Sequence, residues 1–428
     1  MFKGLTKAEK SWAMFDWADS AYATTVLTVV MSMYFLHSAQ QAGLDNAQAA
    51  ANYGFANGFV TLIAGLMSPI LGTLSGFKGK KKVLFNFFTF IGIVATLAIA
   101  IVPSDNWFML LVVYMISAIA FNACNKVYDA FLADVSPKEN MNRVSSLGFG
   151  LGYIGGAIAF VISIVLLVLT LMGVVNVDIN VSYQVAFLVT GIWWLIFAIP
   201  FFKNVKQVIG VEPEKNYIKQ SFINIGITLK DIAKDKKILL FLIAFFLYSD
   251  GVGSIIRMAV IYGETIGINQ MILLVILLVL QLIAFPFSIL YGKLADKYGA
   301  KRIIYVCILT YCVVCGIALF MNPNLETSTL TNMFWILAIL VGTAQGGIQA
   351  LSRSYFGRII PKEKSNEYYG IYNVFGRFAS IIGTTLFGVI SLATGYPHLG
   401  IAGIVVVFIL AAIIFKFVPD DRALVHQA

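Results

Sequence analysis

Charge is scarce in this sequence. Only 12% of the 428 residues are charged, whereas 59% are apolar. Soluble domains carry about 25% charged residues. The apolar residues are spread along the whole chain and are not confined to one end. This composition excludes an ordinary soluble protein and indicates a chain that is embedded in a membrane.

Residues that carry catalysis or bind metals are also rare. The three histidines are His37, His398 and His426, and none of them lies in an HExxH pattern. The four cysteines all lie in apolar runs, which predicts no disulfide framework. The sequence has no phosphate-binding, glycine-rich loop that ends in GK[ST]. We therefore expect no enzyme, no cofactor, no metal site and no ATP-driven mechanism.

Long apolar stretches follow one another from residue 11 to residue 418. A membrane-crossing helix needs about 20 mostly apolar residues, so these stretches can cross a bilayer. The sequence therefore predicts an all-α membrane protein with twelve transmembrane helices. Their predicted ranges are 11–37, 48–76, 83–103, 107–133, 144–171, 182–203, 237–262, 268–292, 302–321, 331–357, 366–394 and 397–418.

Basic residues are concentrated in alternate loops. Of the 30 lysines and arginines, 26 lie in the segments 1–11, 77–82, 134–143, 203–237, 293–302, 357–365 and 416–428. The loops on the opposite side carry Asp45, Asp105, Asp178, Glu264 and Glu326 but no basic residue. Because basic loops stay in the cytoplasm, we expect both termini there. This distribution accounts for the net charge of +9 without a nucleic-acid partner.

The longest polar segment separates six predicted helices from six. We expect an N-terminal bundle over residues 1–202, a cytoplasmic linker over 203–236 and a C-terminal bundle over 237–428. Within the linker, apolar residues recur at helical spacing, at Phe222, Ile225, Leu229 and Ile232. This pattern predicts an amphipathic helix on the inner leaflet. A plain solvated linker is the alternative.

The two halves of the sequence repeat each other. Residues 72–82, GTLSGFKGKKK, return at an offset of 220 as GKLADKYGAKR at 292–302. The tripeptide PKE at 137–139 returns at an offset of 224, at 361–363. Paired halves of this kind are typical of transporters that hold a substrate near the middle of the membrane. The two six-helix bundles are therefore expected to be pseudo-symmetric.

The repeated loop carries a family resemblance. GKLADKYGAKR resembles the loop signature of the major facilitator superfamily. Further stretches are similar to its vacuole-effluxer-like branch, namely WAMFDWADSAYATT, VYDAFLADVSP…RVSSLGFGLGYIGG, FFLYSDGVGSIIRMAVIYG and GGIQALSRSYFGRIIP…YYGIYNVFGRFASIIG. That branch contains the autophagy-related fungal vacuolar amino-acid exporter and many bacterial members. The resemblance implies the major facilitator fold.

The resemblance also implies a gating role for the loop in the second half. The residues concerned are Gly292, Asp296, Lys297, Gly299, Lys301 and Arg302. A basic cytoplasmic turn without a gating role is the alternative. The first half departs from the pattern at Gly76, where the superfamily loop carries an aspartate.

Eight charged residues lie deep within the predicted helices. They are Asp16, Asp19, Lys126, Asp129, Asp250, Arg257, Arg353 and Arg377. A charge near the bilayer centre costs about 2.5–3.5 kcal/mol on the insertion scale, so it faces protein or a water-filled cavity. The eight lie on the first, fourth, seventh, tenth and eleventh predicted helices. In the superfamily, helices 1, 4, 7 and 10 line the central cavity, which agrees with this distribution.

Seven of these charges, all except Asp16, and their polar neighbours form the predicted substrate cavity. The set is Asp19, Tyr22, Asn125, Lys126, Asp129, Tyr248, Asp250, Arg257, Gln349, Arg353, Asn373 and Arg377. Two alternatives concern members of this set. Lys126 and Asp129 can form a purely structural pair, and Arg353 can bind lipid headgroups or Asp134.

Asp250 is the predicted centre of proton coupling, together with Asp19. At about 1.5 Å per residue, Asp250 lies roughly 20 Å from the inner end of its helix. A desolvated carboxylate takes up a proton more readily than one in water. Asp19 lies opposite Asp250 in the repeat, at an offset of 231.

The sequence thus predicts a secondary transporter that works by alternating access. A cavity with both charge signs, hydroxyls and amides suits a small polar or zwitterionic solute, such as an amino acid or a peptide. Transport of amphiphiles such as lysolipids is one alternative, and a membrane receptor or enzyme is another. The expected partners are the solute, the lipid bilayer and a proton or other coupling ion, with no nucleic acid. We expect a monomer in the inner membrane of a bacterium.

Overall fold

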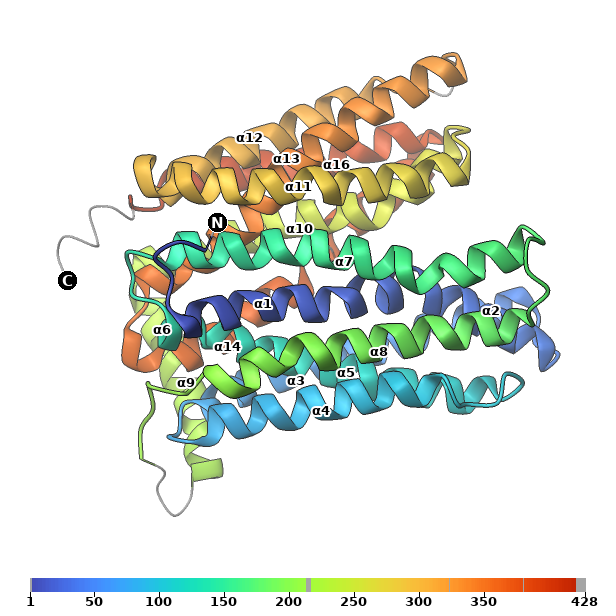
Figure 1. Cartoon of the computed structure of the whole chain (residues 1–428). Helices are drawn as coiled ribbons and strands as arrows, with labels where there is room; N and C mark the ends of the chain where they lie inside the picture. Colours follow the sequence, from blue (N-terminus) through green and yellow to red (C-terminus); the bar gives the residue numbers. More distant parts are fainter. Residues whose placement is uncertain (1, 213–216, 323, 380, 421–428) are drawn as a thin grey trace. The chain divides into compact units, whose positions relative to one another are not determined.

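The chain is built almost entirely of helices (Figure 1). The computed structural model describes residues 2–212, 217–322, 324–379 and 381–420, and within them the only β-structure is one isolated bridge. The prediction of an all-α membrane protein is confirmed. The helices are α1 (Lys7–Tyr22), the π-helix η1 (Ala23–Val30), α2 (Met31–Gln41), α3 (Asn46–Ser75), α4 (Lys80–Ile99), α5 (Trp107–Ala130), α6 (Leu132–Val135), α7 (Met141–Leu171), α8 (Ile179–Asn204), α9 (Tyr217–Lys234), α10 (Lys236–Thr265), α11 (Gln270–Tyr298), α12 (Ala300–Leu319), α13 (Thr327–Ile359), the 3₁₀-helix η2 (Lys362–Lys364), α14 (Ser365–Phe378), α15 (Ile381–Thr394) and α16 (Pro397–Lys416).

Eleven helical segments in the described part of the chain are long and apolar enough to cross a membrane. They correspond to eleven of the twelve predicted helices, and most ends lie within four residues of the predicted ones. The predicted end at 292 is wrong, because α11 continues to Tyr298. The remaining prediction, 11–37, falls on the run formed by α1, η1 and α2. That run extends from Lys7 to Gln41, which is also sufficient to span a bilayer.

The first membrane helix contains a π-helical segment that the sequence did not predict. η1 covers Ala23–Val30, between α1 and α2. The spacing of the buried residues shows the wider turn of the π-helix. The buried pair Thr25 and Val26 is followed by the next pair, Val30 and Met31, after five residues. The pair after that, Tyr34 and Phe35, follows after four. Extended π-helices are rare, and short π segments occur often at functional sites.

The predicted helix 366–394 is interrupted. α14 ends at Phe378 and α15 begins at Ile381. An interrupted membrane helix leaves backbone groups that need partners from elsewhere, because no water is available in the hydrocarbon. In this protein the partner is a side chain of α10, described below.

Contacts divide the chain into two compact units. The first contains the residues up to Val135, Leu151–Ile225 and Glu363–Gly370, and the second contains Ser136–Gly150, Gly226–Lys362 and the chain from Ile371 onward. The helices α7, α9 and α14 contribute residues to both units. The predicted division into residues 1–202, 203–236 and 237–428 describes the sequence repeat and stays a prediction.

Aromatic side chains fill the inner part of the first unit. Trp12 stacks on Tyr128 with ring centroids 4.5 Å apart, and Phe85 lies 4.1 Å from Phe201. Phe15 contacts Phe85, Tyr128 and Phe201. These contacts join α1, α4, α5 and α8, and Figure 1 shows α1 running beside α8. The corresponding cluster in the second unit joins α10 to α13.

The repeat seen in the sequence is also present in the packing. A Cβ at Gly72 would lie 2.8 Å from the backbone oxygen of Asn366, in the first turn of α14. A Cβ at Gly292 would lie 3.5 Å from the backbone oxygen of Asn142, in the first turn of α7, and 2.6 Å from the Cβ of Ser146. Asn142 and Asn366 are separated by the offset of 224 found for the PKE repeat. In each unit, a glycine near the end of one helix therefore packs closely on the start of another.

The linker begins with a segment that binds the loop after α3. Phe77 and Val211 form the isolated parallel bridge. The N–H of Val211 donates to the carbonyl oxygen of Gly76 at 3.0 Å, and the N–H of Lys78 donates to that of Val211 at 2.8 Å. The Lys78 ammonium also pairs with Glu212 at 2.7 Å. Residues 205–212 are thus fixed to the end of α3 and the start of α4.

The helix predicted in the linker is α9. On its predicted apolar face, Ile232 is buried and Ile225 is half-buried, whereas Phe222 and Leu229 are exposed. The buried side of α9 also carries the polar residue Thr228. The apolar face is therefore only partly used for packing within the chain, and its position on the inner leaflet stays a prediction.

Candidate functional site

Two predicted cavity residues of α1 are buried. Asp19 is 4% exposed and Tyr22 is fully buried. The hydroxyl of Tyr22 accepts a hydrogen bond from Ser117 at 2.9 Å, and its ring stacks on Phe121 with centroids 4.7 Å apart. Tyr22 is therefore part of the core of the first unit and contributes no open surface in this structure.

Three predicted residues of α5 are more open. Asn125, Lys126 and Asp129 are each half-buried. The amide of Asn125 donates to the carbonyl oxygen of Phe121 in its own helix, at 3.1 Å. Lys126 and Asp129 are one turn apart and share a helix face. These residues keep part of their surface available to a solute or to water.

Asp250 lies at the break between α14 and α15. Its side chain is fully buried in α10. The N–H of Ile382 donates to Oδ1 at 2.9 Å, and the N–H of Gly383 donates to Oδ2 at 2.6 Å. These N–H groups belong to the first turn of α15 and have no partner within that helix. Asp250 thus caps a neighbouring helix, where a negative charge is stabilised by the helix dipole.

Gly383 makes this approach possible. A Cβ at this position would lie 2.4 Å from the hydroxyl oxygen of Ser254 and 2.7 Å from Oδ2 of Asp250. Both Asp250 and Ser254 lie on one face of α10 because they are one turn apart. Only a residue without a side chain brings the backbone of α15 this close to α10.

The other predicted residues of the second unit differ in exposure. Tyr248 is buried and its hydroxyl lies 2.6 Å from that of Ser352. Asn373 is buried, Gln349 is half-buried and Arg257 is exposed. Arg377 belongs to α14, and its side chain lies outside the described part of the structure. The structure therefore places these residues on α10, α13 and α14, as predicted, but only some of them are open.

Arg353 is held by α7. Its side chain is 3% exposed. Nε donates to the hydroxyl of Ser145 at 3.0 Å and Nη2 donates to the carbonyl oxygen of Ser145 at 3.2 Å. The guanidinium carbon lies 4.3 Å from the ring centroid of Phe149. The alternative in which Arg353 binds lipid headgroups is therefore wrong for this structure, because the side chain does not reach the surface.

Further hydrogen bonds connect the start of α7 to α11 and α13. Ser145 donates to the carbonyl oxygen of Ala350 at 2.8 Å, and Ser354 donates to Asn142 Oδ1 at 2.8 Å. Ser288 donates to the carbonyl oxygen of Ser146, also at 2.8 Å. Residues 141–150 are thus held by a continuous set of buried polar contacts in the second unit.

The predicted gating loop is mostly helical, and only Gly299 lies between α11 and α12. Gly292, Asp296 and Lys297 belong to the last turns of α11, and Lys301 and Arg302 belong to the first turn of α12. Gly292 and Gly299 are buried, and Gly299 has a φ of +91°, a conformation that favours glycine. Lys301 donates to the carbonyl oxygen of Lys416 at 3.0 Å. The remaining members of the loop set are exposed, namely Asp296, Lys297 and Arg302. The structure accounts for the glycines, and the gating role stays a prediction.

One buried ion pair was not predicted. The Lys81 ammonium contacts the Asp134 carboxylate, and both side chains are 0% exposed. Oδ1 of Asp134 also accepts the N–H groups of Val208 at 2.7 Å and Ile209 at 2.6 Å. Asp134 therefore joins the end of α6 to α4 and to the linker. Asp134 lies in VYDAFLADVSP, one of the stretches that resemble the family, and this could have drawn attention to it. No regular spacing in the sequence relates it to Lys81.

The sequence matches a family described as "Vacuole effluxer Atg22 like", over residues 45–140 and 133–428. It is 43% identical to the uncharacterized MFS-type transporter YxiO of Bacillus subtilis (strain 168), over 99% of this chain and 97% of the relative. It is 25% identical to autophagy-related protein 22 of Vanderwaltozyma polyspora, over 79% of this chain and 71% of the relative.

Solved structures agree on the fold. The proton:xylose symporter XylE aligns with a TM-score of 0.73 at 13% identity, over 97% of this chain and 96% of that one. The transporter FucP in an outward conformation aligns with a TM-score of 0.73 at 15% identity, over 97% and 98%. The relative from Bacillus subtilis is an MFS-type transporter, and the expectation that the chain is not an enzyme is confirmed. The chain is an integral, multi-pass membrane transporter that belongs to the vacuole effluxer Atg22-like family within the major facilitator superfamily.

Proposed function

We propose that the chain transports a small polar or zwitterionic solute, such as an amino acid or a peptide, by alternating access with proton coupling. The deep charges of both signs support this class of solute, because a zwitterion needs partners for both of its charges. The proposed setting is the inner membrane of a bacterium, with both termini in the cytoplasm and the chain acting as a monomer. The distribution of lysine and arginine among the loops supports that orientation.

The capping of α15 by Asp250 is the observation that supports proton coupling most directly. Discontinuous helices form the substrate and ion sites of many transporters. A proton on Asp250 would remove the charge that the N–H groups of Ile382 and Gly383 now compensate. The contact between α10 and α15 would then weaken. Proton binding and helix movement are thereby linked, because each state of the helices binds the proton with a different affinity.

Uptake driven by a pH gradient into proteoliposomes tests this role. We expect Asp250→Asn to abolish gradient-driven uptake, and Asp19→Asn to reduce it. Asp105→Asn is the control, because Asp105 is exposed in a loop and should leave uptake unchanged. Thermal unfolding should show that each variant is folded. Undiminished gradient-driven uptake in Asp250→Asn would rule out the proposed coupling.

Thermal-shift screening of the purified protein tests the solute class. Amino acids and dipeptides should raise the unfolding temperature, because a ligand that binds the folded state stabilises it. Stabilisation by lysolipids alone would contradict the proposal and favour transport of amphiphiles.

A further inference from the structure

The asparagine in the first turn of α14 differs in its hydrogen bonds from the equivalent asparagine of α7. Asn142 and Asn366 occupy equivalent positions in α7 and α14. Asn142 Oδ1 accepts a hydrogen bond from Ser354. Asn366 is 1% exposed, and neither Oδ1 nor Nδ2 has a partner among the described residues. At the offset of 224, the position that matches Ser354 is Ala130, which has no hydroxyl to donate.

An unpaired buried amide is costly, because its hydrogen bonds to water are lost and not replaced. Both polar atoms of Asn366 are in this state. Buried polar groups in native proteins nearly always have a partner, so an exception calls for an explanation. A ligand that binds both the donor and the acceptor would provide one.

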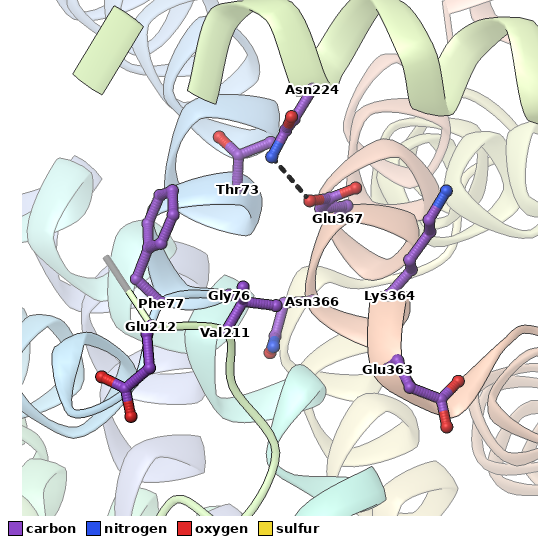
Figure 2. A pocket seen from close by; sticks show the side chains of 10 residues that line it. All are labelled: Thr73, Gly76, Phe77, Val211, Glu212, Asn224, Glu363, Lys364, Asn366 and Glu367. Carbon is purple, nitrogen blue, oxygen red and sulfur yellow. Dashed lines mark hydrogen bonds between the residues drawn. The ribbon is translucent and has the colours of Figure 1, made fainter. Parts of the chain in front are cut away.

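Asn366 lines a pocket of about 140 Å³ in the first unit. Figure 2 shows this pocket, with side chains from the end of α3, the linker, α9 and the start of α14. A Cβ at Gly76 would lie 3.9 Å from the Cβ of Asn366. The matching loop of the second half carries Asp296 where the first half has Gly76, so the missing side chain leaves space beside Asn366.

The charges around the pocket have both signs. Glu363 and Lys364 of η2 and Glu367 of α14 line it where the helix dipole at the start of α14 favours an anion, and Glu212 of the linker adds a third carboxylate. Glu367 accepts a hydrogen bond from Asn224 of α9 at 3.2 Å. A simple anion would meet three carboxylates, and a simple cation would meet the positive end of the helix dipole. Metal binding has no support, since the described residues contain no group of three potential metal ligands.

We propose that this pocket binds a small zwitterion of the amino-acid type, with its carboxylate at the start of α14 and its ammonium group toward Glu367. The amide of Asn366 donates to the carboxylate and accepts from the ammonium group. Phe77 and Val211 provide an apolar wall for a short side chain. A cavity of about 150 Å³ holds a molecule the size of benzene, so this volume suits a small amino acid. None of the residues that line this pocket belongs to the predicted substrate cavity, so the proposal does not depend on which solute is carried.

Calorimetric titration of the purified, full-length protein tests the proposal. Glycine, L-alanine and L-serine are the probes, and acetate and ethylamine each carry only one of the two charges. We expect saturable binding of at least one amino acid, and binding at least tenfold weaker for both single-charge compounds. Absence of binding by all three amino acids would overturn the proposal.

Asn366→Leu is the informative variant. It should weaken this binding at least tenfold, while the ligand-free protein unfolds at the same or a higher temperature, because leucine leaves no polar atom unpaired. Gly76→Asp should also weaken binding, because its carboxylate would enter the pocket. Unchanged affinity in both variants would overturn the proposal.

Asn142→Leu is the matched control in the other repeat. It removes the hydrogen bond from Ser354 and should lower the unfolding temperature without changing the affinity. If the transport pathway also binds amino acids, Asp250→Asn should alter that second binding event and leave the one that depends on Asn366. The two proposals can therefore fail independently.

Discussion

Lys81 and Asp134 form an ion pair in which both side chains are completely buried. The pair connects α4 to the end of α6, and its carboxylate also holds the backbone of Val208 and Ile209. Lys81 donates in addition to the carbonyl oxygen of Ala130 at 3.3 Å. The two charges are thus surrounded by hydrogen-bonding partners and not by lipid.

Asp134→Ala should destabilise the protein strongly. Removing one partner of a buried pair leaves an uncompensated charge and costs about 3–5 kcal/mol. The double variant Lys81→Met/Asp134→Leu should be clearly more stable than the single variant, because neither charge is then buried. Thermal unfolding in detergent measures both. A double variant that is no more stable than Asp134→Ala would show that the pair is not the source of the loss.

Gly383→Ala should separate α15 from α10. The added Cβ would lie 2.4 Å from the hydroxyl of Ser254, and overpacking of this kind costs about 1–3 kcal/mol. Gly388→Ala is the control on the same helix, because nothing lies within 4 Å of its added Cβ. Unfolding temperatures should fall for the first variant and stay the same or rise for the second. Equal temperatures would contradict the close contact.

Gly292→Ala should be rescued by a change in its neighbour. The added Cβ would lie 2.6 Å from the side chain of Ser146, so Gly292→Ala alone should lower stability by about 1–3 kcal/mol. The double variant Gly292→Ala/Ser146→Gly removes the clash and should recover most of the lost stability. Gly72→Ala has no such rescue, because its nearest atoms belong to the backbone of Asn366 and Gly370. Unfolding temperature is the readout, and absence of rescue would contradict the assigned contact.

Gln207→Ala should loosen the linker. Its Nε2 donates to the carbonyl oxygens of Ser75, Phe77 and Ile209 at 2.9–3.2 Å, and its Oε1 accepts the N–H of Lys81 at 3.0 Å. Without these bonds the segment should open more often, and trypsin should cleave after the exposed Lys206 several-fold faster.

Mass spectrometry of the tryptic fragments follows this cleavage. Gln41→Ala is the control, since Gln41 is exposed and its side chain lies 3.1 Å from His37, far from the linker in the sequence. Equal cleavage after Lys206 in the wild type and Gln207→Ala would exclude the proposed anchoring.

The membrane helices were predictable because their length and composition are set by the bilayer. The stretch 107–133, for example, is uncharged from Trp107 to Asn125 and became α5 with the expected first residue, Trp107. The loop repeat was equally visible, since Gly72 and Gly292 recur in similar surroundings. Spacing and composition were sufficient for both.

The two irregular helices were not predictable in the same way. Ala23–Val30 is as apolar as an ordinary membrane helix, so nothing in its composition indicates a π segment. The break after Phe378 also lies in an apolar stretch, and the carboxylate that accepts the N–H groups at the start of α15 belongs to Asp250, which is more than 120 residues away. Likewise, the burial of Arg353 depends on Ser145 and Phe149 of α7, and helical spacing within α13 carries no information about that partner.

The π segment of the first helix has a practical consequence for mapping the transport pathway. In a cysteine scan along residues 7–41, an ordinary α-helix would show labelling that recurs about every 3.6 residues. Across Ala23–Val30 the π-helix rotates the chain differently, so the labelled face from Met31 onward should be displaced around the helix axis. Positions assigned to lipid or to water by extrapolation from Asp19 would therefore be wrong in the outer part of the helix. The two ends of this helix have to be phased separately.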